Sequence, residues 1–396
     1  MKEGKTGIEV SIAASIAAKL ARVEVVAAYP ITPQTHIVEH LSELVANGEL
    51  DASYVNVESE HSAMSACCGA SAAGARTFTS TSAQGMELMH EILFIASAMR
   101  FPIVMAAVNR ALSSPLSIWG DHSDVMAARD TGWIMLFCEN GQEVVDSIIM
   151  AFKIAEDRRV LLPVMVNLDG FSLSHVIEPI EFPSQEKVDA FLPPYDPLYT
   201  LHPDKPVTMG AYGMPELYTE AKYAQEMALI DSKKVVIEVM DDFGKRFGRS
   251  YKPVETYNTE KADTVFIALG SINENIKTAI DMLKEEGREV GLIHLRLFRP
   301  FPSDELIAAL KGVKRVAVIE RAMPGGAMNS PLFNEISSLV HSNSMGIQLN
   351  NYIVGLGGRD VNPEDFHGII DDMLSPEAKK ETPKEEKNYR VIGVRG

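Results

Sequence analysis

Short apolar runs alternate with helix-like segments along the first part of the chain. Apolar residues recur at helical spacing over residues 7–20, and a β-branched run at residues 24–28 ends at Tyr29 and Pro30. The same patterns predict further strands at residues 53–57, 76–81, 103–107, 135–138 and 162–166. They predict helices between them, at residues 33–46, 60–73, 85–99, 121–130 and 142–156. This alternation is typical of an α/β fold whose parallel sheet is covered on both faces.

Ligands bind such sheets in the loops beyond the carboxyl ends of the strands. Four loops are therefore candidates for a site: YPITP (residues 29–33), VESEH (57–61), TSTSAQG (79–85) and NRALS (109–113).

A second pattern follows a proline-rich connection. Residues 182–207 hold six prolines, so we expect an extended crossing segment there with no regular element. A helix is expected at residues 217–228, and Lys245, Arg246 and Arg249 are interpreted as charges on a solvated, glycine-rich turn. The second unit is predicted to have strands at residues 263–269, 289–295 and 315–320, with helices at 273–286 and 303–310.

The domain boundaries follow from these patterns. We expect a first domain over residues 1–250, a second over residues 258–370 and a charged arm over residues 371–396. Residues 375–388 hold almost no apolar side chain and cannot bury a core, so they are interpreted as a solvated arm that could become ordered against a partner.

Composition narrows the classes of function. A net charge of −17 over 396 residues disfavours nucleic acid and anionic lipid as partners. No apolar stretch approaches the roughly 20 residues that span a bilayer, so we expect a cytoplasmic protein. The three cysteines, Cys67, Cys68 and Cys138, form no CxxC and no cluster-binding spacing.

Several motifs occur in a specific order: AAYPITPQT (residues 27–35), VNVESEHSAMSA (55–66), TSTSAQGMELMHE (79–91), NRALSSPLSIWGDHSD (109–124) and RDTGW (129–133). Together they closely resemble the α (core) subunit of 2-oxoacid:ferredoxin oxidoreductases, above all that of pyruvate:ferredoxin oxidoreductase. The resemblance continues more loosely through LRLFRPFP (295–302) to GLGGRD (355–360). It implies a pyrimidine-binding domain for thiamine diphosphate, followed by an α/β domain similar to the C-terminal domain of transketolases.

Glu60 matches the family's cofactor-activating glutamate. A carboxyl group shared with the pyrimidine N1′ favours the imino tautomer, whose nitrogen then removes the thiazolium C2 proton. The alternative is that Glu58 or Glu60 only caps a helix, because acidic side chains favour helix N-termini.

Arg110 and Thr32 match the family's substrate-binding residues. The guanidinium fork of Arg110 can hold a carboxylate through two parallel hydrogen bonds, and the hydroxyl of Thr32 can hydrogen-bond the substrate. The alternatives are a surface or capping role for Arg110 and an N-cap role for Thr32, with Pro33 as the first helical residue. For Thr32 both roles can hold at once.

Other residues are weaker candidates. Pro30, Ile31 and Ser82 are expected to line the cofactor, and Gly85 suits a loop that a ligand approaches closely, although such loops are more often simple turns. Asp121, His122 and Asp124 could bind a metal ion in principle, but such residues more often cap a helix. We assign no metal to this chain.

The chain lacks the motif that holds the diphosphate. Enzymes of this kind bind it through Mg²⁺ on a GDG sequence followed by Asn, and the nearest fragment here is Leu168-Asp169-Gly170, without the Asn. We therefore expect a β subunit to carry the diphosphate half-site. By resemblance, Mg²⁺ and Fe4S4 clusters belong to partner subunits (β, γ and δ or their equivalents), electrons pass to ferredoxin, and the acyl group passes to coenzyme A.

The expected function is CoA-dependent oxidative decarboxylation of a 2-oxo acid. A neutral Thr32 disfavours a dicarboxylate, and the GDHSD loop favours pyruvate, with 2-oxoisovalerate as the alternative substrate. Two other classes stay open, a transketolase-like transferase subunit without redox chemistry and a non-catalytic scaffold.

Overall fold

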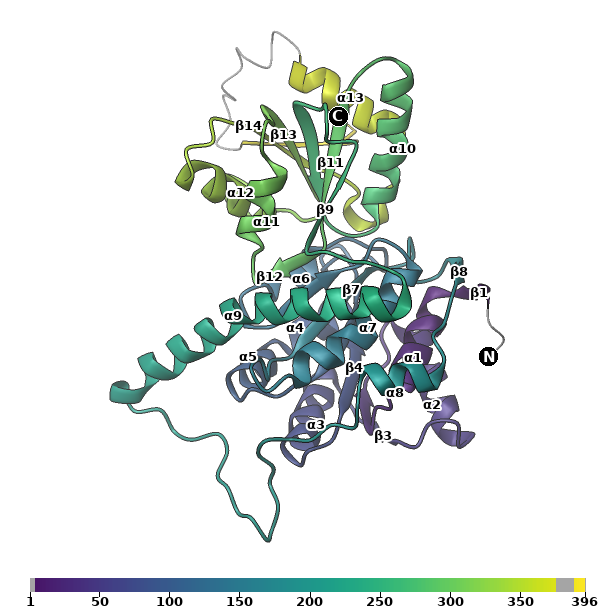
Figure 1. Ribbon diagram of the computed structural model, residues 1–396, viewed down its shortest axis with the longest axis vertical. Coiled ribbons are helices and arrows are strands. Elements are labelled where there is room, and N and C mark those ends of the chain that lie inside the picture. Colours follow the sequence, from purple (N-terminus) through teal and green to yellow (C-terminus); the bar gives the residue numbers. More distant parts are fainter. Residues whose placement is uncertain (1–3, 375–387, 396) are drawn as a thin grey trace.

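The computed structural model describes residues 4–374 and 388–395. Two α/β domains are stacked one above the other, and the long helix α9 (Pro215–Phe247) lies near their boundary and projects beyond the body of the molecule (Figure 1).

The first domain is built on a seven-stranded sheet in the order β12-β6-β7-β5-β4-β2-β3. Its strands are β2 (Val25–Ala28), β3 (Ser53–Asn56), β4 (Thr77–Thr81), β5 (Val104–Asn109), β6 (Ile134–Phe137), β7 (Val164–Asp169) and β12 (Leu297–Arg299). The first six are parallel, whereas β12 comes from the second half of the chain and pairs antiparallel with β6. All residues of β5 and β7 are buried, as expected of strands covered on both faces.

The helices of this domain are α1 (Val10–Leu20), α2 (Thr35–Ala46), α3 (Glu60–Ala72), α4 (Ala83–Leu88), α5 (His90–Ala98), α6 (Ser123–Ala127) and α7 (Gly141–Glu156). The predicted parallel α/β fold is confirmed. Residues 6–9 form strand β1 (Thr6–Glu9) instead of the start of a helix, and β1 pairs antiparallel with β8 (Ile177–Ile180). The single helix expected at residues 85–99 is two helices, and the one expected at 121–130 is only the short α6.

The proline-rich segment was predicted to hold no regular element, and this was wrong. Helix α8 (Gln185–Phe191) forms between its prolines, with Ser184 Oγ accepting a hydrogen bond from the backbone N–H of Lys187. Val188 and Phe191 are buried, and the ring of Phe191 contacts that of Phe243 on α9. Apolar burial therefore stabilises a helix that proline flanks without interrupting.

The charged stretch before residue 250 is not a solvated turn. Lys245 and Arg246 lie in the last turn of the 33-residue helix α9, which ends at Gly248 in the left-handed conformation (φ 74°). Arg249 reaches the buried carboxylate of Asp146 at 2.6 Å. A buried carboxylate requires such a partner, and sequence patterns do not show partners that lie about a hundred residues apart.

The second domain has a six-stranded sheet in the order β15-β14-β13-β10-β11-β9. Its strands are β9 (Val254–Tyr257), β10 (Thr264–Ala268), β11 (Val290–Leu295), β13 (Arg315–Glu320), β14 (Gln348–Ile353) and β15 (Tyr389–Val391). Helices α10 (Ile272–Glu285) and α13 (Pro363–Leu374) cover one face, and α11 (Ser303–Ala309) and α12 (Pro331–Ser342) cover the other (Figure 1). The expected βαβαβ unit thus forms the centre of a larger sheet.

Most of the predicted solvated arm, residues 375–387, lies outside the described residues. Beyond it, β15 adds a parallel strand to β14, an element that the sequence analysis did not predict. Within the described part of the chain, no helix combines the length and apolar character needed to cross a bilayer.

Asp169 joins the two domains. Its carboxylate contacts His122 at 2.7 Å and Arg321 at 2.6 Å, and it accepts two hydrogen bonds from Ser271. Burial opposes the ionised form, but the charges of Arg321 and His122 hold the pKa of Asp169 well below its usual range. The GDHSD loop and the Leu168-Asp169-Gly170 fragment therefore form part of a domain interface.

Candidate functional site

The candidate loops meet at one edge of the first sheet. Strand β2 lies between β3 and β4. The chain therefore runs from β2 to β3 on one side of β2, and then crosses to β4 on the other side. The loops that follow β2, β4 and β5 in these parallel strands open on the same edge, at a topological switch point where α/β sheets bind ligands. These loops carry Thr32, Ser82 and Arg110.

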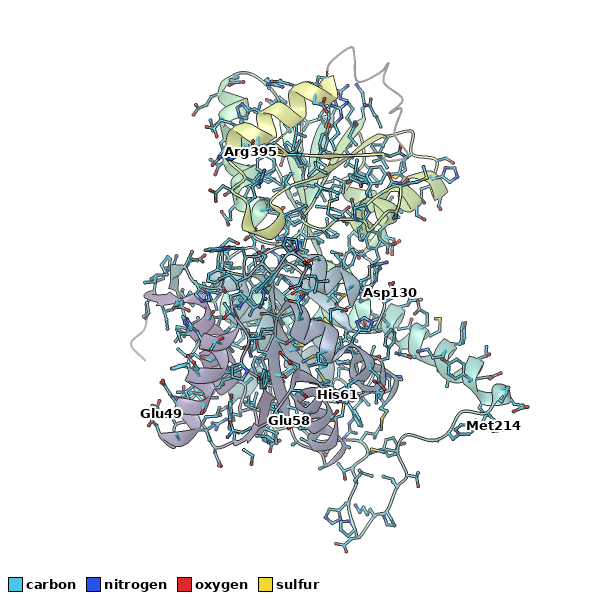
Figure 2. All side chains as sticks on the ribbon, turned by 180° about the vertical axis from the view of Figure 1, so that it is seen from behind. Glu49, Glu58, His61, Asp130, Met214 and Arg395 are labelled. Carbon is cyan, nitrogen blue, oxygen red and sulfur yellow. The ribbon has the colours of Figure 1, made fainter. Side chains whose placement is uncertain are left out.

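Glu60 is a buried carboxyl group at the start of α3. The N-cap is neither Glu58 nor Glu60 but Ser59, whose Oγ accepts from the N–H of Ser62, and Glu58 binds the Ser62 hydroxyl at 2.5 Å. Glu60 is the acidic residue in the first turn of the helix. Glu60 is only 5% exposed, whereas the flanking Glu58 lies on the surface (Figure 2). Burial raises the pKa of Glu60, and the hydrogen bond to its own backbone N–H opposes this shift.

Gly85 packs directly against Glu60. A Cβ atom at this position would lie 2.6 Å from Glu60 Oε1 and 2.4 Å from Thr81 Oγ1, closer than real atoms approach. The hydroxyl groups of Thr81 and Ser82 are buried and have no hydrogen-bond partner within the described residues. Buried polar groups are normally paired, so these hydroxyls beside a buried carboxyl group suit a polar ligand such as an aminopyrimidine ring.

Arg110 and Thr32 are in contact. The Arg110 Nη1 group donates to the Thr32 carbonyl oxygen at 2.8 Å, and its Nε donates to the Ser117 carbonyl oxygen at 2.7 Å. Arg110 is 6% exposed, and burial lowers the pKa of its guanidinium. It is therefore a buried, oriented cation and not a surface charge.

The N-cap role considered for Thr32 is wrong. Helix α2 begins at Thr35, its N-cap position is occupied by Gln34, and Thr32 is exposed. Of its neighbours, Pro30 is exposed and Ile31 is half-buried.

Gln34 is a residue that the sequence analysis missed. Its side chain accepts from the N–H of Ile31 at 3.2 Å and donates to the Ser80 carbonyl oxygen at 2.8 Å. The YPITP loop is thereby tied to β4, next to the two unpaired hydroxyls. In the sequence, Gln34 stands out only because it lies within the AAYPITPQT motif.

Asp124 was considered only as a metal ligand or a helix cap, yet it connects two site loops. It is fully buried, and its Oδ2 accepts the backbone N–H groups of Ala83 and Arg110, both at 2.9 Å. Burial raises the pKa of Asp124 to about 7, against these hydrogen bonds. Asp124 thus fixes the loop that carries Ser82 relative to the loop that carries Arg110.

Asp121 and His122 face the second domain instead. Asp121 accepts hydrogen bonds from Ser123 and from the N–H of Gly357, and His122 binds Asp169. Asp121, His122 and Asp124 of the GDHSD loop therefore have different partners and do not converge on one point.

Fold and site together define a subunit of a thiamine diphosphate-dependent enzyme. Residues 16–241 match the family model described as pyruvate flavodoxin/ferredoxin oxidoreductase, thiamine diphosphate-binding, and residues 262–366 match core domain II of pyruvate:ferredoxin oxidoreductase. The chain belongs to the pyruvate:ferredoxin oxidoreductase family and is an oxidoreductase subunit.

Curated relatives include subunits named for pyruvate and for ketoisovalerate. Pyruvate synthase subunit PorA of Methanocaldococcus jannaschii is 52% identical over 92% of this chain and 94% of its own length. Ketoisovalerate oxidoreductase subunit VorA of Pyrococcus furiosus is 50% identical over 91% of each chain.

Two solved structures share the fold. A 2-oxoglutarate:ferredoxin oxidoreductase from Magnetococcus marinus is 21% identical with a TM-score of 0.69, and the match covers 94% of this chain but 66% of that longer one. A split-gene transketolase is 13% identical with a TM-score of 0.52, over 90% of this chain and 92% of that one. The second match fits the predicted transketolase-like arrangement of two α/β domains.

Proposed function

We propose that this chain is the α subunit of an enzyme that decarboxylates pyruvate oxidatively, with Thr32, Glu60 and Arg110 forming one wall of the active site. The observation that carries the proposal is the buried carboxyl group of Glu60, beside the Thr81 and Ser82 hydroxyls that have no hydrogen-bond partner within the described residues. These groups line the same sheet edge as the oriented guanidinium of Arg110.

The residues fit the pyrimidine half of thiamine diphosphate. When bound, this cofactor supplies the carbon nucleophile that attacks a 2-oxo group. Glu60 holds a proton at the pyrimidine N1′, and its raised pKa favours that shared proton. Gly85 leaves the room that the Glu60 carboxyl group and the Thr81 hydroxyl occupy, and Ser82, Ile31 and Pro30 line the surroundings of the ring.

Arg110 and Thr32 orient the substrate. Nη1 and Nε of the guanidinium already donate to the Thr32 and Ser117 carbonyl oxygens, which fixes the plane of the fork. The other N–H groups of Arg110 then donate to the substrate carboxylate. The exposed Thr32 side chain supplies a hydroxyl group to the same substrate.

Pyruvate is the proposed substrate, and 2-oxoisovalerate is the second candidate. The relatives named for pyruvate and for ketoisovalerate are 52% and 50% identical, so overall similarity does not separate the two. The substrate can be identified by measuring CoA-dependent ferredoxin reduction by the purified complex with a panel of 2-oxo acids. We expect kcat/KM to be highest with pyruvate, and a higher value for 2-oxoisovalerate would overturn this choice.

The remainder of the active site belongs to partner subunits in this proposal. A β subunit holds Mg²⁺ and the diphosphate, β, γ and δ subunits or their equivalents carry Fe4S4 clusters, and ferredoxin accepts the electrons. The three cysteines of this chain are buried and free, in accord with a cytoplasmic complex whose clusters lie on other chains.

The surface also supports assembly. Residues 193–214 and the start of α9 project from the body of the first domain (Figure 1), near Met214 in Figure 2. They expose large apolar side chains, among them Tyr199, Tyr212, Leu217 and Tyr218. Such a surface is typical of an interaction site.

The identity of the co-purifying chains tests this assignment. We expect one to carry GDG followed by Asn, together with four cluster-binding cysteines. Partners without cluster-binding cysteines would support the transketolase-like alternative. A complex without thiamine diphosphate would support the scaffold.

A further inference from the structure

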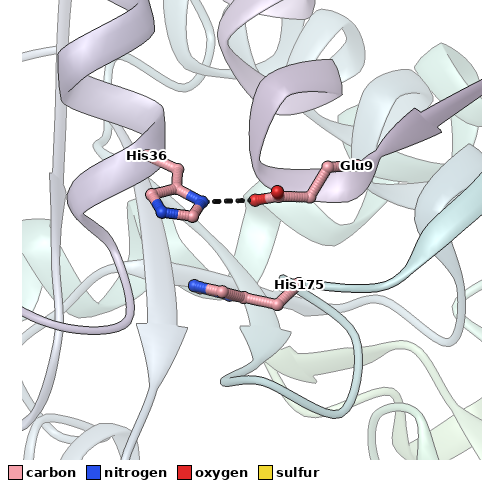
Figure 3. Close-up of side chains that lie close together, drawn as sticks. All are labelled: Glu9, His36 and His175. Carbon is pink, nitrogen blue, oxygen red and sulfur yellow. Dashed lines mark hydrogen bonds and ion pairs between the residues drawn. The ribbon is translucent and has the colours of Figure 1, made fainter.

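Three side chains from distant parts of the first domain converge outside the proposed active site. Glu9 ends β1, His36 is the second residue of α2, and His175 lies in the loop between β7 and β8 (Figure 3). Glu9 Oε1 and His36 Nδ1 are 2.6 Å apart, and the two imidazole rings are 4.6 Å apart. One ligand atom from each residue lies within 4.8 Å of the other two.

His175 is held by its neighbour. Its Nδ1 lies 2.8 Å from the Oγ of Ser174, which already accepts the backbone N–H of Phe171 at 2.9 Å. With Nδ1 as donor to Ser174, the lone pair of Nε2 is free, which is the arrangement that supporting residues give to metal-binding histidines. Burial lowers the pKa of His175, opposed by Glu9 and reinforced by His36, and this favours the neutral imidazole.

We propose that Glu9, His36 and His175 bind a divalent transition-metal ion of the zinc type. Two imidazoles and one carboxylate are preferred ligands of Zn²⁺, and a three-residue set leaves a fourth position for water. All three residues are half-buried, so an ion can enter from solvent. The rings are tilted by 33° to one another, and binding of a shared ion requires them to turn toward it.

Such an ion would connect three separate segments. His36 follows Thr32 by four residues and is the second residue of α2, so the ion would fix the start of α2 and with it the end of the YPITP loop. His175 is in ring contact with Phe171, and Phe171 with Trp119 of the NRALSSPLSIWGDHSD motif, at 4.6 Å in each case. The site is independent of the cofactor proposal, because none of its ligands is assigned a role there.

The competing interpretation is an ion pair between Glu9 and His36, with His175 stacked on it. The test is calorimetric titration of the chelator-treated, full-length chain with zinc chloride. We expect one ion per chain at micromolar affinity, and at least about a tenfold loss of affinity in His36→Gln, in His175→Gln and in Glu9→Gln. The control is His202→Gln, which alters an exposed histidine outside the cluster and leaves binding unchanged.

Thermal unfolding separates loss of the site from loss of the fold. Zinc is expected to raise the Tm of the wild type and of His202→Gln, because a ligand bound only by the folded state stabilises it. Zinc should leave the Tm of each of the three cluster variants unchanged. The proposal is overturned by absence of micromolar binding, by unchanged binding in the folded cluster variants, or by loss of binding in His202→Gln.

Discussion

The guanidinium of Arg110 donates a hydrogen bond to the backbone carbonyl oxygen of Thr32 at 2.8 Å. The two residues are 78 positions apart in the sequence, on the loops that follow β5 and β2. Because this contact uses the Thr32 carbonyl, the Thr32 hydroxyl and the remaining N–H groups of Arg110 are available to a substrate. One contact therefore sets the position of both predicted substrate-binding residues.

Arg110→Ala tests the substrate role. Removing the cation should raise the KM for pyruvate by an amount equivalent to roughly 2–5 kcal/mol, because a charged hydrogen-bonded partner of the substrate carboxylate is lost. Arg110→Lys retains the charge without the planar fork and should fall between the wild type and Arg110→Ala. Steady-state kinetics of the assembled complex measure both, and an unchanged KM in Arg110→Ala would remove Arg110 from the substrate site.

Gly85→Ala tests the space beside Glu60. The added Cβ would lie 2.4 Å from Thr81 Oγ1 and 2.6 Å from Glu60 Oε1, so these groups must move. We expect a loss of thiamine diphosphate affinity of at least about tenfold, which corresponds to roughly 1.4 kcal/mol. Cofactor titration of the depleted complex measures it.

The matched control is Gly69→Ala, in helix α3. A Cβ atom there meets nothing within 4 Å, and alanine favours a helix over glycine by up to about 1 kcal/mol. This variant should bind the cofactor normally and unfold at the same or a higher Tm. Equal cofactor affinity in the two variants would contradict the proposed pyrimidine site.

Asp124→Asn tests the link between the two site loops. Asp124 Oδ2 accepts two backbone N–H groups, from Ala83 and Arg110, and a neutral amide oxygen accepts them more weakly. We expect kcat/KM to fall while the chain remains folded, and Asp121→Asn serves as a control that changes the domain interface instead. Wild-type kcat/KM in Asp124→Asn would show that the link is dispensable.

The same variant should alter the dependence of stability on pH. A carboxyl group whose pKa is raised from about 3.9 to about 7 on folding binds its proton more tightly in the folded state. Its contribution to the free energy of unfolding therefore decreases as the pH rises through this range. Urea unfolding at pH 5 and pH 8 should show a larger loss of stability in the wild type than in Asp124→Asn, and parallel losses would refute the assignment.

The domain interface gives a stability prediction. In Asp169→Asn the buried guanidinium of Arg321 loses its carboxylate partner, and such a loss costs about 3–5 kcal/mol. The control is Asp204→Asn, which alters an exposed carboxylate 3.8 Å from His202 and should change stability by less than about 0.5 kcal/mol. Denaturant unfolding measures both, and equal midpoints would contradict the role of Asp169 at the interface.

Sequence patterns predicted the buried strands of the first sheet well, because each strand is a local apolar run ending in polar loop residues. They also placed Thr32, Ser82 and Arg110 at one edge, which follows from parallel topology alone. The bonds of Asp124 to Ala83 and Arg110 and of Gln34 to Ser80 could not be predicted, since they join loops that are distant in the sequence. Helix α8 was missed because burial of Phe191 outweighed the local proline signal.

The central claim is that Glu60 acts on the cofactor at a site shared with a partner subunit. Glu60→Gln in the assembled complex tests it most directly, with Glu58→Gln as the control because Glu58 is exposed and bonds only locally to Ser62. Burial raises the pKa of Glu60, so its ionised form is disfavoured in the fold, and the neutral amide should leave stability unchanged or higher. CoA-dependent reduction of ferredoxin by pyruvate should be abolished in Glu60→Gln and retained in Glu58→Gln, whereas near-wild-type turnover in Glu60→Gln would contradict the claim.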